Sequence, residues 1–114
     1  MELQHPLPDE VVELIARRFR LLGDPTRIRI LERLRDGEAG VQELCGIVGS
    51  TQQNVSKHLA VLGDAGIVAR RREGSTTRYR VVDEGVYRLC EDICGAMERR
   101  LEDLRLAFSG SRRD

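Results

Sequence analysis

Residues 49–68 read GSTQQNVSKHLAVLGDAGIV, and this stretch decides the fold. Its apolar residues recur at positions i, i+4 and i+7, which fall on one face of a helix: Val55, Leu59 and Leu62. Ser50 can cap the N-terminus of this helix, and Gln53, three residues later, can complete a capping box. Gly66 suits the position just beyond a helix C-terminus. The stretch therefore predicts a helix that is anchored to a core by one apolar stripe.

The opposite face of this helix is polar and short of acid. Its first two turns carry hydrogen-bonding side chains: Gln52, Gln53, Ser56, Lys57 and His58. Glutamine can read adenine edges, and serine and lysine can bind phosphates or base acceptors, whereas carboxylates would be repelled by DNA. This composition is typical of a recognition helix that enters a groove of double-stranded DNA.

The segment before this helix fits the same interpretation. Residues 41–48 predict a short apolar helix, and Gly49 supplies the tight turn that leads into the next one. Together, residues 41–66 are predicted to form a helix-turn-helix.

A basic hairpin is predicted directly after the helix-turn-helix. Two β-prone runs, residues 67–72 and 76–82, surround the turn Glu73-Gly74-Ser75. Alternation along the second run predicts two faces: Tyr79 and Val81 on one, Arg78 and Arg80 on the other. Three arginines crowd the first run: Arg70, Arg71 and Arg72. A basic two-stranded wing beside a helix-turn-helix predicts a winged helix.

The rest of the chain predicts helices on both sides of this motif. Residues 1–8 are expected to be a flexible arm, residues 9–22 a helix, and residues 109–114 a disordered tail. Asp24-Pro25 is expected to open a second helix that ends at Asp36-Gly37. Its inward-facing residues are predicted to be Ile28, Leu31 and Leu34. We expect one domain over residues 9–108, mainly α-helical with a small β-hairpin wing.

The last predicted helix, residues 84–108, carries a long apolar stripe. The stripe consists of residues spaced by three and four positions: Val86, Cys90, Ile93, Met97, Leu101, Leu104 and Phe108. This spacing resembles a coiled-coil seam, and a small core cannot cover so long a stripe by itself. We therefore expect the long N- and C-terminal helices to form the interface of a homodimer.

Charge is unevenly distributed along the 114 residues, although the formal net charge is zero. Residues 50–80 contain six basic and two acidic residues, whereas residues 83–105 contain four basic and seven acidic ones. A basic reading head joined to an acidic helix suits a protein that contacts phosphate with one face only. There is no signal peptide or apolar run of the ~18 residues that a membrane span needs, so we expect a cytoplasmic protein without a membrane partner.

Several segments together carry a family resemblance. They are residues 22–31 (LGDPTRIRIL), 43–45 (ELC) and 54–59 (NVSKHL), with Leu62, Gly66 and Val68, and the wing residues Arg72-Glu73-Gly74 and Arg78-Tyr79. In this order they resemble the ArsR/SmtB family of bacterial repressors, over residues 12–97. The resemblance implies a homodimeric repressor that leaves its operator when an inducer binds.

The chain departs from the family's best-known inducer sites. The arsenic and cadmium type has two cysteines separated by one residue, but here Cys45 is followed at that spacing by Ile47. The zinc type requires aspartate and histidine residues on the last helix, and no histidine follows His58, so that site is absent. The remaining sulfur ligands are Cys90 and Cys94.

Two interpretations of the cysteines stay open. Cys90 and Cys94 are spaced i, i+4, so a helix separates their Cβ atoms by ~5–6 Å. That distance exceeds the ~3.5–4.5 Å of a disulfide, but two thiolates can still ligate one soft ion. Alternatively, Cys90 is a small core hydrophobe. Cys45 is expected to pack, unless the fold brings it near the other two and completes a three-sulfur metal site.

These observations lead to one predicted function and two rivals. We predict a sequence-specific, homodimeric repressor that binds double-stranded operator DNA and is released by a soft metal or metalloid ion or by a thiol-reactive species; no resident cofactor is predicted. The DNA-binding residues are expected to be Ser50, Thr51, Gln52, Gln53, Asn54, Ser56, Lys57, His58, Arg70, Arg71, Arg72, Thr76 and Arg78. The rivals are a winged-helix protein-interaction module and a redox or reactive-sulfur regulator that binds no metal. An enzyme is not expected, because no nucleophile, base and acid form a catalytic set.

Overall fold

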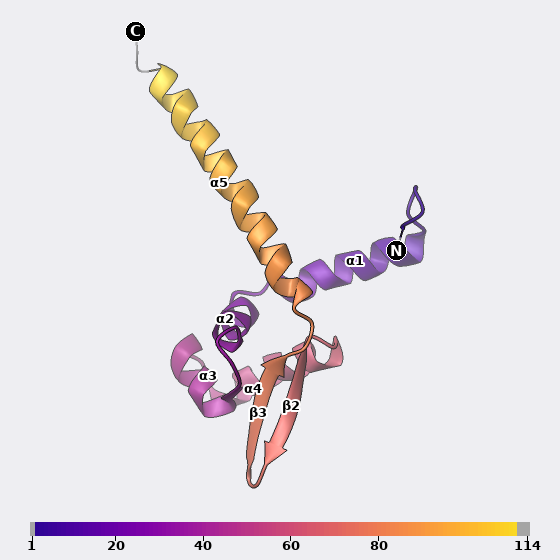
Figure 1. Cartoon of the computed structure of the whole chain (residues 1–114), viewed down its shortest axis with the longest axis vertical. Coiled ribbons are helices and arrows are strands. Elements are labelled where there is room, and N and C mark those ends of the chain that lie inside the picture. Colours follow the sequence, from indigo (N-terminus) through magenta and orange to yellow (C-terminus); the bar gives the residue numbers. More distant parts are fainter. Residues whose placement is uncertain (1, 112–114) are drawn as a thin grey trace. The chain divides into compact units, whose positions relative to one another are not determined.

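The computed structural model describes residues 2–111, which form two units that meet between Val82 and Asp83. The first unit contains α1 (Asp9–Leu22), α2 (Pro25–Leu34), β1 (Ala39–Gly40), α3 (Val41–Val48), α4 (Gln52–Asp64), β2 (Val68–Glu73) and β3 (Thr76–Val81) (Figure 1). The second unit contains α5 (Gly85–Ser111). This order of elements is the predicted one, with the addition of β1.

Helix α2 begins where the sequence predicts. Asp24 is its N-cap, and the Asp24 Oδ1 atom accepts a hydrogen bond of 3.1 Å from the backbone N–H of Arg27, while Pro25 occupies the first helical position. The buried residues of α2 are Ile30, Leu31 and Leu34. The prediction that Ile28 faces inward is wrong, because its side chain is 47% exposed. Ile30 lies about 200° around the helix from Ile28, so both cannot face one core.

The turn between α3 and α4 depends on Gly49. Its φ of 67° is left-handed, and its N–H donates to the Cys45 carbonyl at 2.9 Å, which closes the end of α3. Helix α4 is capped by Thr51, whose Oγ1 accepts a hydrogen bond of 3.1 Å from the backbone N–H of Asn54. The prediction that Ser50 is the cap is therefore wrong by one residue. Ser50 instead accepts a 2.6 Å hydrogen bond from the Asn54 side-chain amide.

A small apolar core joins α2, α3 and α4 to the start of β2. Its fully buried larger side chains are Ile30, Leu44, Val55, Leu59, Leu62 and Ile67. Helix α4 contributes the three residues of the predicted stripe, and all three are buried. Gly66, at φ 74°, then turns the chain out of the helix, as predicted, and the Ile67 N–H returns to the Leu62 carbonyl at 3.0 Å. The core thus fixes which face of α4 points outward.

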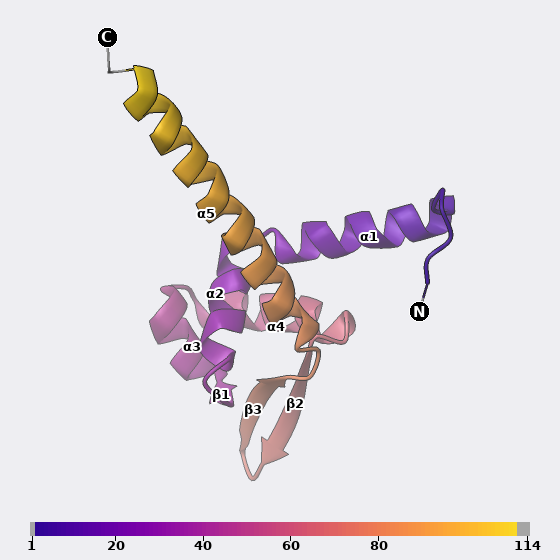
Figure 2. The ribbon, with the colours of Figure 1, turned by 45° about the horizontal axis from the view of Figure 1, so that its top comes forward.

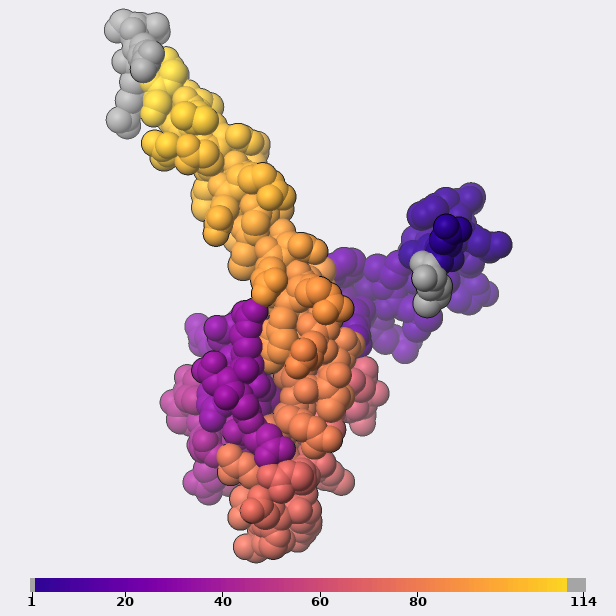
Figure 3. All heavy atoms as spheres, in the orientation of Figure 1, coloured from indigo at the N-terminus to yellow at the C-terminus, as the bar shows by residue number. Residues whose placement is uncertain are grey.

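The wing is a three-stranded antiparallel sheet in the order β1-β3-β2. The hairpin pairs Val68 with Val81 and Glu73 with Thr76, around a two-residue turn. Strand β1, which the sequence did not predict, pairs Ala39 with Tyr79 on the other edge of β3 (Figure 2). Two small residues offer no alternating or β-branched signal. In Figure 3 the purple atoms of the α2–β1 region border the salmon atoms of the hairpin at the lower end of the view.

Helix α1 buries none of its residues. Several members of its predicted apolar stripe are exposed, with 61% of Leu14 and 56% of Phe19 accessible. Residues 2–8, which precede it, contain no helix or strand. Met1, the first residue of the expected arm, lies outside the described residues.

The second unit consists largely of α5, which is longer than predicted. The helix runs to Ser111, so residues 109–111 are helical and not part of a disordered tail. Extending an existing helix costs far less than starting one, and no proline stops it here. Residues 112–114 of the expected tail lie outside the described residues. Val86 is buried, but the stripe beyond it is exposed, including 64% of Leu101.

No described helix combines the length and the apolar character that crossing a membrane requires.

The cap of α2 leads to a prediction about stability. Hydrogen bonding to the backbone N–H of Arg27 lowers the pKa of Asp24. Because the folded-state pKa is depressed, the stabilisation is present above the unfolded pKa of about 3.9 and is lost as the pH falls through the folded value. We expect Asp24→Ala to lower the free energy of unfolding at pH 7 by about 1 kcal/mol in urea titrations.

Asp24→Asn is the matched control, because asparagine caps helices as well as aspartate does. At pH 7 the free energy of unfolding of this variant should stay near that of the natural chain. As the pH falls, the variant should not show the loss of stability that protonation of Asp24 causes in the natural chain. An Asp24→Ala variant as stable as the natural chain would show that this cap contributes nothing.

Candidate DNA-binding surface

The polar residues at the start of α4 divide into two groups. One group is held by contacts within the protein: Ser50, Thr51 and Asn54 form the cap described above. His58 is half-buried, and its Nδ1 lies 3.5 Å from the Arg27 Nη1 atom on α2. These four residues were predicted to contact DNA, but their side-chain polar atoms are engaged at the junction of α4 with the rest of the unit.

The second group points outward from the first two turns of α4. It consists of Gln52, Gln53, Ser56 and Lys57, all of which are exposed. The first turn of α4 contains no acidic residue. The N-terminal end of a helix also carries a partial positive charge, which favours a phosphate nearby. This face therefore combines hydrogen-bonding groups with a positive potential.

The wing places one of its faces beside α4. Side chains alternate along a strand, so Arg70 and Arg72 of β2 lie on the same face as their cross-strand partners Tyr79 and Thr77. A groove is lined by Ser56 of α4 together with Arg70 and Tyr79 of the wing. A second hollow is lined by Ser56 with Gln52 and Gln53. Ser56 thus links the outward face of α4 to the wing face that carries Arg70.

The arginines of this face have no acidic partner in the described structure. Among residues 2–111, no hydrogen bond or ion pair is found for the side chains of Arg70 and Arg72, and both residues are exposed. The face beside α4 therefore presents unpaired positive charge.

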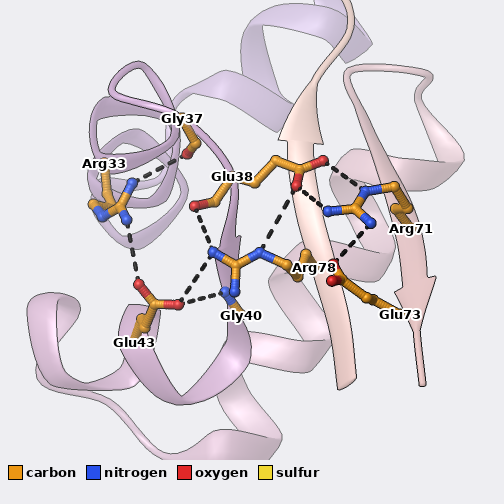
Figure 4. A network of polar contacts seen from close by, with 8 residues as sticks. All are labelled: Arg33, Gly37, Glu38, Gly40, Glu43, Arg71, Glu73 and Arg78. Atoms are coloured by element: carbon orange, nitrogen blue, oxygen red, sulfur yellow. Dashed lines mark hydrogen bonds and ion pairs between the residues drawn. The ribbon is translucent and has the colours of Figure 1, made fainter. Parts of the chain in front are cut away.

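On the opposite wing face, carboxylates hold Arg71 and Arg78 (Figure 4). The Glu38 carboxylate holds Arg71 with two hydrogen bonds, 2.6 Å to Nη2 and 3.1 Å to Nε. Glu73 holds the same guanidinium through Nη1 at 2.9 Å. The hydrogen bonds from Arg71 lower the pKa of Glu38 and, with those to Glu73, raise the pKa of Arg71. Arg71 is therefore satisfied within the protein.

Arg78 is engaged on the same face. Its Nε lies 3.7 Å from Glu38 Oε1, and its Nη2 donates to the Glu38 backbone carbonyl at 3.2 Å. Glu43 continues the network, 3.7 Å from Arg78 and 3.3 Å from Arg33 of α2. The four wing arginines that the sequence assigned to DNA are thus divided between two faces. Thr76 is exposed at the end of the hairpin.

Sequence analysis missed Glu38 and Glu43, although a signal was present. A two-residue turn after Glu73 sets the hairpin register and places Arg71 opposite Arg78. Like charges directly opposite each other destabilise a strand pair. The register therefore called for carboxylates from another part of the chain.

The three cysteines are free thiols in different settings. Cys45 on α3 is half-buried, whereas Cys90 and Cys94 on α5 are exposed. A core residue would be covered by its own chain, and Cys90 is not. Within residues 2–111, no group of three or more histidine, cysteine, aspartate or glutamate side chains is arranged to hold a metal ion.

The geometry up to this point is that of a winged helix with one cationic face. Residues 24–70 match the family model described as the bacterial regulatory protein arsR family. The relative KmtR, an HTH-type transcriptional regulator of Mycobacterium tuberculosis, is 45% identical over 76% of this chain and 67% of its own length. This chain belongs to the ArsR family. Proteins of this family are DNA-binding regulators of transcription and not enzymes, as the sequence predicted.

Two further similarities are informative. The probable mercury resistance operon repressor of Streptomyces lividans is 44% identical over 62% of this chain and 57% of its own length, so this chain spans little more than half of that relative. The solution structure of the homodimeric winged helix-turn-helix DNA-binding domain of Mb0332 from Mycobacterium bovis is 28% identical, with a TM-score of 0.71, and covers 88% of this chain and 95% of that domain. The predicted fold class is confirmed.

Proposed function

We propose that this ArsR-family chain is a homodimeric repressor that binds double-stranded operator DNA sequence-specifically. The observation that carries the proposal is that Ser56 and Arg70 line one groove. Because of this, the outward face of α4 and the unpaired face of the wing are directed toward the same ligand. Base-reading side chains and phosphate-binding cations on one continuous surface are what sequence-specific recognition requires.

The contacts are assigned according to side-chain chemistry. Gln52 and Gln53 suit hydrogen bonds to base edges in the major groove, where glutamine pairs well with adenine. Ser56 and Lys57 suit phosphates or base acceptors. Arg70 and Arg72 suit the flanking backbone or the minor groove. Arg71 and Arg78, which the sequence included among the contacts, are left out because carboxylates already hold them.

The proposed dimer rests on the uncovered stripes of α1 and α5. Large apolar residues exposed at helical spacing favour burial against another chain. The long α5 stripe suits a coiled-coil-like seam with a second copy, and the homodimeric Mb0332 domain, a similar structure, is consistent with it. Two copies would place two recognition helices on a near-palindromic operator.

The proposed inducer acts on Cys90 and Cys94. Both thiols are exposed on α5 at i, i+4, so they can supply two soft ligands to one metal or metalloid ion. The similarity to a repressor named for mercury resistance is consistent with this choice. A ligand that binds better to the DNA-free arrangement weakens operator binding by its difference in affinity, typically about 1–3 kcal/mol.

The first prediction from the proposed function concerns the salt dependence of DNA binding. Using an operator selected from a random duplex pool, log affinity should fall linearly with log salt, at about −0.9 per phosphate neutralised. Arg70→Ala and Arg72→Ala should each make this slope shallower by about 0.9 and weaken binding to all sequences. Gln53→Ala should instead relax discrimination at one half-site position by about 1–3 kcal/mol.

The matched control is Arg29→Ala, which removes one exposed guanidinium from α2. Its slope should stay that of the natural chain. A salt-independent affinity, or an equal loss of slope in the control, would contradict the proposed surface.

The second prediction concerns assembly. Leu101→Glu would place a carboxylate in the proposed seam, at a cost of several kcal/mol. Sedimentation velocity should show a dimer for the natural chain and a monomer for the variant. Glu98→Gln, a change on the same helix that adds no charge, is the control and should remain dimeric. A natural chain that is monomeric at high concentration would overturn the dimer.

The third prediction concerns release by the inducer. Cys90→Ser and Cys94→Ser should bind the operator as the natural chain does but fail to dissociate on exposure to arsenite or cadmium in a gel shift. Cys45→Ser should dissociate normally unless its thiol completes a three-sulfur site.

Peroxide and a persulfide donor are included as separate arms of the same assay. Release by these reagents alone would favour a redox or reactive-sulfur regulator over a metal sensor. If the natural chain keeps its operator in all four arms, these cysteines do not sense such inducers.

A further inference from the structure

The wing contains a like-charge conflict that its own strands do not resolve. The hairpin register places Arg71 of β2 directly opposite Arg78 of β3, and alternation puts both side chains on one face. Two guanidiniums in such positions repel each other. Glu73 of β2 supplies a carboxylate to Arg71 alone, at 2.9 Å from Nη1, so the counter-charge that both guanidiniums share comes from outside the hairpin.

Glu38 supplies this counter-charge from the segment just before β1. Its Oε1 atom contacts both guanidiniums, at 2.6 Å from Arg71 Nη2 and 3.7 Å from Arg78 Nε. Its Oε2 atom accepts a second hydrogen bond from Arg71, so Arg71 and Glu38 form a bidentate pair. The carboxylate thereby uses the two guanidinium donors that could otherwise bind a phosphate in the same way. The side chain of Glu38 is 28% exposed, less than that of either arginine. Glu38 thus lies between the two cations as a fixed anion.

The whole network on this face carries no net charge. Its three guanidiniums belong to Arg33, Arg71 and Arg78, and its three carboxylates to Glu38, Glu43 and Glu73. The opposite face presents Arg70 and Arg72 without acidic partners in the described part of the chain. The two faces of the hairpin therefore differ: the arginines beside α4 have no acidic partner in the described residues, whereas Arg71 and Arg78 on the other face are paired with carboxylates, next to an exposed Arg80.

We propose that Glu38 determines how well this protein distinguishes its operator from other DNA, by withholding Arg71 and Arg78 from phosphates. This inference rests on the proposed function. Phosphate contacts strengthen binding to every duplex alike, whereas base contacts carry the sequence information. Each guanidinium that Glu38 withholds therefore lowers non-specific affinity and leaves base reading by α4 intact.

Both faces of the hairpin are close enough to DNA for this to matter. A strand is one residue thick, and arginine side chains are long and flexible. At physiological salt, charges interact over about 8 Å. Without the Glu38 carboxylate, Arg71 keeps only exposed Glu73, and Arg78 keeps Glu43 at 3.7 Å and the Glu38 backbone carbonyl. Both guanidiniums then have donors that can turn to the phosphates bordering a wing placed on DNA by Arg70 and Arg72.

The test compares two duplexes of about three helical turns: one selected from a random pool by the natural chain, and one of fixed arbitrary sequence. Affinities are measured by fluorescence anisotropy over a range of salt concentrations. For Glu38→Gln we expect binding to the arbitrary duplex to tighten by about two- to fivefold per guanidinium freed. The slope of log affinity against log salt should steepen by about 0.9 per added phosphate contact. The ratio of operator to arbitrary affinity should fall.

Two controls separate this effect from a simple change of charge. Glu32→Gln removes an exposed carboxylate from α2 of the same unit and should leave the slope unchanged. Arg71→Gln with Arg78→Gln should also keep the natural slope, and adding Glu38→Gln to that pair should produce no steepening. If Glu38→Gln alone unfolds, the Arg71→Gln, Arg78→Gln variant still tests the premise that these two arginines do not bind phosphate in the natural chain.

The outcomes are distinct. A natural chain that binds neither duplex refutes the proposed function itself. A natural chain that binds, together with a Glu38→Gln variant of unchanged slope, refutes only the role of Glu38. A shallower slope in the Arg71→Gln, Arg78→Gln variant would refute it as well, because it would show that these arginines already bind phosphate.

Discussion

The burial of one stripe of α4 is the constraint on which the rest of the structure depends. Val55, Leu59 and Leu62 are fully or almost fully buried against α2, α3 and the start of β2. Because side chains repeat every 3.6 residues, fixing this stripe also fixes which residues face outward. Gln52, Gln53, Ser56 and Lys57 are exposed as a consequence. The face of α4 proposed to read DNA is thus fixed by core packing.

The wing is constrained in a different way, by charge. The arginines of two such strands repel each other. Carboxylates offset this repulsion on one face only, where Arg71 lies opposite Arg78. Strand β1 joins the hairpin to the helical core, and the carboxylates of Glu38 and Glu43, on either side of β1, pair with Arg71 and Arg78. The face toward α4 keeps its unpaired cations. In the proposed function, the stability of the hairpin and the selectivity for DNA both depend on this one arrangement of charges.

Much of this organisation could be predicted from local signals. Apolar spacing predicted α4 and its buried stripe, Asp24-Pro25 predicted the start of α2, and the β-prone runs predicted the hairpin. Two failures were local, the one-residue shift of the α4 cap to Thr51 and the helical residues 109–111. The others depended on contacts between distant segments. Ile28 was wrongly assigned to the inward face of α2, because the elements packed against α2 decide which of its faces is buried. Strand β1 was missed because two residues are too few to show an alternating pattern.

The sequence predicted which residue types make up the candidate surface, but not how its arginines are divided between the two faces of the wing. The sequence identified Arg70, Arg71, Arg72 and Arg78 as one basic patch, because local charge counts ignore strand faces. Strand alternation divides that patch between two faces, and Glu38 and Glu43, more than twenty-five residues away in sequence, pair with the arginines of one face. The same limit applies to His58, whose side chain turns toward Arg27.

The central claim is that only one face of the wing, together with α4, meets DNA. The most direct test is to follow the arginine Nε–H signals by NMR as a selected operator duplex is added to the protein. The signals of Arg70 and Arg72 should shift, while those of Arg71 and Arg78, already held by carboxylates, should stay in place. Equal shifts of all four, or shifts confined to Arg71 and Arg78, would contradict the account.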